Sequence, residues 1–299
     1  MVRRRLGRDR ALALARADGL DAALSELART AYGHEVHPGM DLRDARHAVS
    51  AVTLWHLRVL AGWGPALGAG RLRALVAGFE VANISGHLAA LEGRDTRQPF
   101  ELGSMAGVWP LVARAPDAAE VRRVLTASPW GDPGTEEFAA MRIALRLAWA
   151  RRVAEAAPEA GGWAAAWAAL AVARSLAVGA RLTPGTPADR DVAALLGSRW
   201  RAARSATDLR PLVPLGARWV LTEAGADLDG EDGLWVAEAR WWRRVEADAA
   251  RLAASARPDP AVMVGVAGLL GADAWRVRAA LELAARGGGP AGDVLDAVA

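Results

Sequence analysis

The chain has 299 residues, no cysteine, and 37 basic residues against 34 acidic ones, which gives a net charge of +3. The lack of cysteine excludes a disulfide framework, Cys-ligated zinc, iron–sulfur clusters and a thiol nucleophile. Every basic residue is arginine, so the alkaline isoelectric point reflects the absence of lysine and does not by itself indicate nucleic-acid binding.

The apolar segments are predicted to form a protein core rather than membrane spans. The longest uncharged runs, 160–173 and 260–272, are shorter than the ~18–20 apolar residues that cross a bilayer. The arginine-rich N-terminus has no apolar stretch typical of a secretory signal. We therefore expect a soluble, intracellular protein.

The first predicted elements are two long helices. Asp41 begins an amphipathic helix that continues through Val59. A second helix is predicted from Pro65 to Leu91, where Gly93 stops it. Ala, Leu, Arg and Glu, the best helix formers, dominate the whole chain. No alternating apolar runs flank a hairpin turn, so the sequence predicts an all-α fold.

Later helix starts are predicted from residues that cap N-termini. These predicted caps are Asp117, Thr135, Thr186 and Asp259. The last predicted helix, Asp273–Arg286, ends at a glycine-rich stop that begins with Gly287. Breaks rich in proline and glycine at 127–134, 183–187 and 225–233 divide the chain into pieces that are too short for a large α/β domain.

An internal repeat is predicted from three segments that share a spacing. The anchors Asn83, Ala173 and Trp275 lie roughly a third of the chain apart, and each precedes a leucine and then a glycine. In this alignment the second segment has Leu170 and Ala173 where the first has Glu80 and Asn83.

Metal and nucleophile motifs are weak in this sequence. His34-Glu35-Val36-His37 separates its histidines by three residues, whereas zinc proteases need four to place both imidazoles on one helical face. The acidic segment 227–232 lacks the glycine that an EF-hand requires at its sixth position. No P-loop or Gly-x-Ser-x-Gly turn is present. The sequence therefore predicts no catalytic residue, cofactor or metal.

The tryptophans are predicted to pack mainly in helix contacts. Trp163 and Trp167, four residues apart, share one helical face. Trp241 and Trp242 are neighbours, so they cannot both face one core, and we expect one of them to be half-exposed. At the N-terminus, Arg3, Arg4 and Arg5 form either a solvated end of the chain or a docking site for an acidic protein or for anionic lipid head groups.

Several of these segments resemble the C subunit of prokaryotic V/A-type rotary ATPases, which is related to subunit d of the eukaryotic vacuolar enzyme. An arginine-containing N-terminus precedes a Thr-x-Tyr-Gly helix end at Tyr32 and Gly33, and a helix follows with an acid, Glu80, three positions before Asn83. The C-terminal segment, with Trp275, Arg278 and Gly289-Pro290, resembles the last repeat of the family.

The resemblance implies three pseudo-threefold-related helical bundles that form a funnel, with approximate bounds of 1–115, 116–200 and 201–299. It also implies a non-catalytic rotor adapter that couples ATP turnover to proton or other ion translocation. Its partners would be the central-stalk subunits D and F and the membrane proteolipid ring. The protein would therefore be peripheral to the cytoplasmic face of a membrane, without a nucleic-acid partner.

The resemblance assigns structural roles to Tyr32, Gly33, Glu80, Asn83, Trp275 and Arg278. It leaves Arg3, Arg4 and Arg5 as the candidates for partner binding. We expect Glu80 and Asn83 either to lie on an ordinary solvated helix face or to cap or cross-link a neighbouring turn.

Two other functions are compatible with an all-helical chain. A magnesium-dependent isoprenoid-type enzyme would need paired Asp-rich motifs facing one cavity, and only 227–232 qualifies. An arginine-rich nucleic-acid-binding protein would need a charge asymmetry, whereas acidic residues are interspersed with the arginines along most of the chain.

Overall fold

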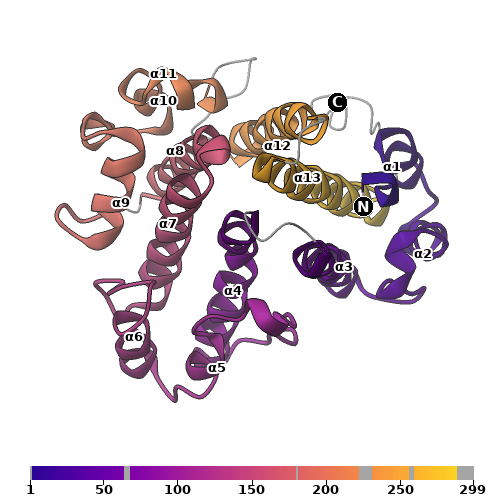
Figure 1. The fold of residues 1–299 in the computed structure, drawn as a ribbon, viewed down its shortest axis with the longest axis horizontal. Helices are drawn as coiled ribbons and strands as arrows, with labels where there is room; N and C mark the ends of the chain where they lie inside the picture. The colour runs from indigo at the N-terminus through magenta and orange to yellow at the C-terminus, as the bar shows by residue number, and fades with distance from the viewer. Residues whose placement is uncertain (1, 64–67, 180, 222–230, 256–258, 288–299) are drawn as a thin grey trace. The chain divides into compact units, whose positions relative to one another are not determined.

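The structure is a computed structural model that describes residues 2–63, 68–179, 181–221, 231–255 and 259–287. Within these ranges all regular structure is α- or 3₁₀-helical and no strand occurs, which confirms the all-α prediction (Figure 1). The α-helices are α1 Arg8–Ala15, α2 Leu20–Leu27, α3 Leu42–Trp63, α4 Ala69–Leu91, α5 Trp109–Val112, α6 Ala118–Thr126, α7 Phe138–Ala156, α8 Gly161–Ala177, α9 Pro187–Leu196, α10 Ala206–Leu209, α11 Leu215–Arg218, α12 Glu231–Ala253 and α13 Pro260–Ala285. The 3₁₀-helices are η1 Val2–Arg4, η2 Ala31–His34, η4 Gly103–Met105, η5 Pro158–Ala160, η6 Arg199–Ala202, η7 Arg210–Leu212 and η8 Trp219–Leu221.

The chain divides into two compact units. Unit 1 combines both ends of the chain, 1–72 and 242–299, and unit 2 comprises 73–241. Helices α4 and α12 each contribute residues to both units. The three bundles expected from the sequence stay a prediction.

Unit 1 is built around helix α13. Helices α1, α2 and α3 pack on it, so the beginning of the chain lies against the last described helix (Figure 1). Helix α12 also approaches closely, since a Cβ atom added at Gly265 would lie 2.6 Å from the main-chain nitrogen of Ala253. Packing on several sides explains why α13 is apolar around most of its circumference rather than amphipathic.

Unit 2 contains one core cluster shared by α4, α5, α6 and α7. Ile84 and Leu88 of α4 are fully buried in it together with Leu125 of α6. Helices α7 and α8 form a hairpin, and α9, α10 and α11 pack against its helices. A short connection joins α7 to α8, so the two helices run antiparallel.

Most predicted helix starts are confirmed because capping depends on local residues. Asp41 lies immediately before α3, and its carboxylate accepts a hydrogen bond at 2.7 Å from the main-chain N–H of Asp44 in the first turn of that helix. Asp117, Thr186 and Asp259 cap α6, α9 and α13 as expected. Thr135 was predicted to cap a helix, but the cap of α7 is Glu137, two residues later. The Thr135 hydroxyl instead accepts a hydrogen bond from Glu137 N.

The predicted start of the last helix, at Asp273, was wrong. The predicted helix is the second half of α13, which runs unbroken from Pro260 through Gly271 to Ala285. Its end is confirmed, since Gly287 follows in a left-handed conformation with φ of 90°. The predicted start at Pro65 and the segment Gly289-Pro290 lie outside the described residues.

Two described helices, Ala69–Leu91 and Pro260–Ala285, are long and apolar enough to cross a membrane by length and composition alone. The core helix of a folded domain meets the same criterion. In α13, 78 % of the most apolar window is buried within the protein, and both helices carry a buried carboxylate that binds other segments of the fold.

Candidate functional site

The most elaborate polar site in unit 1 is centred on Asp273 of α13. Its carboxylate is 1 % exposed, and it accepts main-chain bonds from Leu6 N at 2.8 Å and Gly7 N at 2.9 Å. The Tyr32 hydroxyl donates a third bond, at 2.8 Å. The three donors belong to the start of α1 and to η2, so one side chain fastens both segments to α13. We call this arrangement the Asp273 junction.

The Tyr32-Gly33 turn is shaped to deliver that hydroxyl. The Thr30 side chain accepts a bond from Tyr32 N at 3.2 Å and donates one to Leu27 O at 2.7 Å, which ends α2 and starts η2. Any side chain at Gly33 would collide with the main chain, because its Cβ atom would lie 1.9 Å from Ala28 O. Burial raises the pKa of the Tyr32 phenol well above its ordinary value, and the Asp273 carboxylate raises it further. The phenol is therefore a permanent donor at neutral pH.

A chain of ion pairs continues from the Asp273 junction. Arg276, one turn along α13, places a nitrogen 3.8 Å from the Asp273 carboxylate and also binds Glu246 of α12. Glu246 in turn pairs with Arg5 at 3.3 Å. Arg5, which the sequence left open as a partner-binding residue, is thus engaged within unit 1.

A second buried carboxylate, Glu80 of α4, organises unit 2. It is 4 % exposed. One oxygen accepts main-chain bonds from Gly107 N at 2.7 Å and Trp109 N at 2.9 Å, and the other accepts the Trp130 indole N–H at 3.0 Å. A Cβ atom at Gly107 would lie only 2.9 Å from the carboxylate, so a side chain there would displace the carboxylate from its present position. We call this arrangement the Glu80 junction.

Asn83 lies one turn after Glu80 and binds the adjoining segment. Its amide donates to Phe100 O at 2.9 Å and accepts from Phe100 N at 2.7 Å, which satisfies both main-chain groups of one residue. The contacts of Glu80 and Asn83 are those of the cross-linking alternative and not of a solvated helix face. The explanation for an asparagine within a helix is that its side chain pairs with a loop.

The two junctions are built from similar parts. In each, two main-chain N–H groups lie at the start of a short helix, α1 or α5, and an aromatic donor follows the next helix, α2 or α6. Ser128 repeats the role of Thr30, since it donates to Leu125 O at 2.7 Å and accepts from Trp130 N at 3.1 Å. Each aromatic donor is followed by glycine, Gly33 or Gly131. Units 1 and 2 therefore hold their buried acids with similar sets of donors.

Aligning the two junctions gives a register that differs by one residue from that of the predicted repeat. With Glu80 aligned to Asp273, Asn83 aligns with Arg276 and not with Trp275. The buried residues agree in the new register, because Ile84 corresponds to Val277 and Leu88 corresponds to Leu281. The Ala173 segment of the proposed repeat has no such carboxylate, since α8 contains no acidic residue.

The remaining predicted residues lie apart from the junctions. Trp275 is buried and its ring stacks on Trp242 with centroids 6.3 Å apart, and Trp242 is the half-exposed member of the Trp241–Trp242 pair as expected. Arg278 donates to the Ser50 hydroxyl of α3 at 2.9 Å. Arg3 and Arg4, in η1, are exposed to solvent, whereas Arg5 is half-buried and pairs with Glu246.

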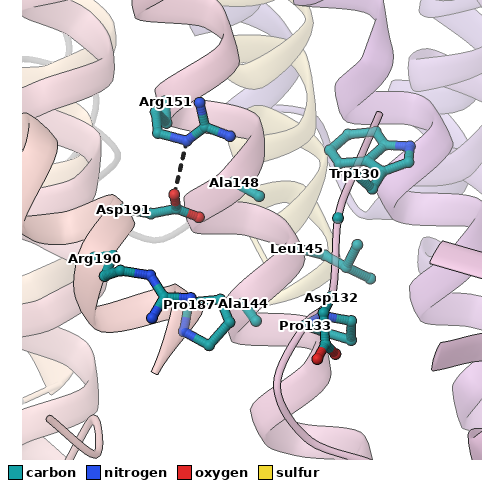
Figure 2. A pocket seen from close by; sticks show the side chains of 11 residues that line it. Trp130, Asp132, Pro133, Ala144, Leu145, Ala148, Arg151, Pro187, Arg190 and Asp191 are labelled. Carbon is teal, nitrogen blue, oxygen red and sulfur yellow. Dashed lines mark hydrogen bonds and ion pairs between the residues drawn. The ribbon is translucent and has the colours of Figure 1, made fainter. Parts of the chain in front are cut away.

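Unit 2 also contains a pocket of about 300 Å³ beside Trp130. Figure 2 shows Arg151 of α7 and Asp191 of α9 pointing toward one another at one side of the pocket. Arg151 Nε donates to Asp191 Oδ1 at 2.7 Å. Burial raises the pKa of Asp191, and Arg151 opposes that shift. Asp132 is bound by Arg122 from outside the lining, which lowers its pKa. The lining charges are thus largely engaged with neighbouring groups, and the pocket resembles a gap between packed elements more than a reaction site.

No group of three or more metal-binding side chains occurs within the ranges that the structure describes. Most of the acidic segment 227–232 falls outside those ranges. Asp189, a further buried acid, is bound bidentately by Arg201, which lowers its pKa. The buried acids of the described residues therefore act in internal hydrogen bonds and ion pairs.

Sequence reasoning missed the role of Asp273 as the carboxylate at the centre of its junction. It also missed Trp130 as the indole donor that binds Glu80. A signal for Asp273 existed, since it is an acid placed among apolar residues of a long helix. Comparison of the chain with protein-family models and with curated proteins gives no match.

Proposed function

We propose that the protein is a non-catalytic rotor adapter of a V/A-type ATPase or ATP synthase. It would join central-stalk subunits D and F to the membrane proteolipid ring, at the cytoplasmic face of the membrane. It would couple ATP turnover to ion translocation mechanically and transform no substrate itself.

One observation carries the proposal. Several of the residues on which the resemblance rests hold segments together at or beside the two junctions: Tyr32 with Gly33 in unit 1, and Glu80 with its neighbour Asn83 in unit 2. The resemblance implies internal repeats, and a repeated junction is what internal repeats would produce. In the proposed architecture, three repeats form a funnel, and the repeat around Ala173 lacks the buried carboxylate.

Stiffness is the physical property that an adapter needs. A torque passed through a soft body would be lost as deformation, whereas close-packed helices resist it. Each junction adds to this stiffness because a buried carboxylate that accepts three hydrogen bonds fixes two further segments to a long helix. These acids are engaged in structural contacts, which favours a mechanical role over a catalytic one.

The test is isolation of the chain with its partners. An affinity-tagged chain should be expressed in its native host cell and purified from membranes in mild detergent. The stalk and proteolipid subunits should then copurify with it. Recovery of the chain without either set of subunits, or a turnover that stays with the pure chain, would overturn the proposal.

The N-terminal arginines provide a variant for the same experiment. Replacing Arg3 and Arg4 by glutamate should lower the yield of copurified subunits, since both are exposed and reversing their charge would repel an acidic partner. The matched control replaces exposed Arg114 and Arg199 of unit 2 in the same way, which changes the net charge equally.

A further inference from the structure

One face of the α7–α8 hairpin carries a group of arginines and tryptophans. Arg142, Arg146 and Trp149 follow one another at helical spacing on α7. The Trp149 ring meets Trp167 of α8 edge to face, with centroids 5.9 Å apart. Because the helices are antiparallel, Arg174, two turns beyond Trp167, lies level with Arg142 and Arg146. We call these five residues the Arg–Trp face.

The flanking arginines of this face have acidic partners within unit 2. Arg142 binds Glu92 at 3.0 Å, just beyond the end of α4. Arg174 binds Glu238 of α12. Both pairs hold their guanidinium groups in place, and both leave Arg146 between them.

Arg146 itself has no hydrogen bond or ion pair with any residue that the structure describes. Its side chain is exposed, yet the pKa of its guanidinium is lowered, first by desolvation and then by the positive charges of Arg174 and Arg142. An exposed cation that has two like charges nearby, and no acidic partner among the described residues, is a site where an added carboxylate would be favourable.

We propose that the Arg–Trp face docks an acidic segment of a protein partner, with Arg146 binding an Asp or Glu side chain of that segment. Tryptophan and arginine are the residues most enriched where binding energy concentrates in protein interfaces. The half-buried Trp149–Trp167 pair supplies an apolar floor beside the charge. This inference rests on the proposed function, which makes the central stalk the partner.

A protein carboxylate fits this face better than a nucleic acid does. A phosphate backbone presents closely spaced negative charges, and binding to it is supplied by arrays of cations. Here Glu92 and Glu238 neutralise the two flanking arginines, so one cation is left to pair with one carboxylate.

The test measures binding of the purified chain to the purified stalk subunits D and F encoded in the same genome. Arg146→Glu should weaken binding at least tenfold, and Arg146→Gln should weaken it less, because glutamine removes the charge without adding repulsion. Arg199→Glu, a reversal at another exposed arginine of unit 2, should leave binding unchanged. The melting temperature of Arg146→Gln should not fall, since no internal pair is lost.

The outcomes separate the inference from the function. If the wild-type chain binds the stalk and Arg146→Glu binds equally well, the inference fails and the proposed function stands. If the wild-type chain does not bind the stalk, both fail. Salt-dependent retention on duplex DNA that Arg146→Glu abolishes would overturn the inference in favour of a nucleic-acid partner.

Discussion

Units 1 and 2 solve the same packing problem with different side chains. In both, an acid on a long apolar helix accepts two main-chain bonds and one from an aromatic ring. In unit 1 the aromatic donor is a phenol and the next turn carries Arg276, which continues into ion pairs. In unit 2 the donor is an indole and the next turn carries the neutral Asn83.

This difference separates what the junction requires from what it tolerates. The main-chain donors recur because they are set by the start of a short helix. The aromatic ring and the residue one turn later vary because any group of suitable reach can complete the site. Arg152, whose guanidinium lies 4.4 Å from the centre of the Trp130 ring, supplies positive charge near Glu80 from a different helix.

The largest effect is expected for Asp273→Asn. The amide places a donor against one of three existing donors and removes the charge opposite Arg276, so unfolding free energy should fall by about 3–5 kcal/mol. Denaturant unfolding measures this, and hydrogen exchange should show the loss in unit 1. Glu282→Gln, on the surface of the same helix, is the control and should cost about 0–1 kcal/mol. Equal losses from both variants would contradict a special role for the junction.

Glu80→Gln should come next, at about 2–4 kcal/mol. The donor conflict is the same, but Asn83 rather than an arginine lies one turn away, so no adjacent ion pair is broken. Hydrogen exchange should rise in segment 100–130 and not around α13. The matched control is Glu155→Gln, which removes only an exposed pair with Arg151. Exchange rising first in unit 1 would break the comparison.

Asn83→Ala is expected to cost about 1–2 kcal/mol, because it leaves both main-chain groups of Phe100 without their partner. The melting temperature should fall accordingly. An unchanged melting temperature combined with lost copurification of partner subunits would instead assign Asn83 to an interface.

The smallest effect concerns pH and distinguishes the phenol from the indole. Tyr32 is the single tyrosine in a chain without lysine or cysteine, so it is the only side chain that ordinarily titrates between about pH 8 and 11. Its folded pKa is raised, so the stability it contributes is complete below about pH 10 and is lost as pH rises further, by up to about 1.4 kcal/mol per pH unit.

Tyr32→Phe should flatten this alkaline dependence and cost about 1–2 kcal/mol at neutral pH through the lost bond to Asp273. Denaturant unfolding between about pH 8.5 and 11 measures both variants. A wild-type profile as flat as that of Tyr32→Phe would show that the phenol ionises equally in the folded and unfolded states.

The sequence predicted the local features of this fold well. Asp41, Asp117, Thr186 and Asp259 mark real helix starts because a cap and the N–H groups it binds lie within three residues of each other. The prediction at Thr135 failed by two residues because Glu137 offers a competing carboxylate at the same turn. The prediction of a separate helix at Asp273 failed because an acid within a helix resembles a cap when its distant partners are unknown.

The candidate sites were predicted only in part. Glu80 and Asn83 were recognised as a pair, whereas Asp273 was not, and the register of the predicted repeat differs by one residue from the register of the two junctions. In a composition rich in alanine and leucine, neighbouring registers score alike until burial shows that Val277 and Leu281 face the core.

By itself, the sequence determined the helical class, most helix ends and the absence of thiol chemistry, since each depends on residue type or on neighbours a few positions away. Only the tertiary structure decided which acids are buried and what they bind. The donors of Asp273 lie 241 to 267 residues from it along the chain, and a carboxylate gives no sign in the sequence of which distant N–H groups will surround it. Folding brings them together because a buried charge is stable only where such donors meet it.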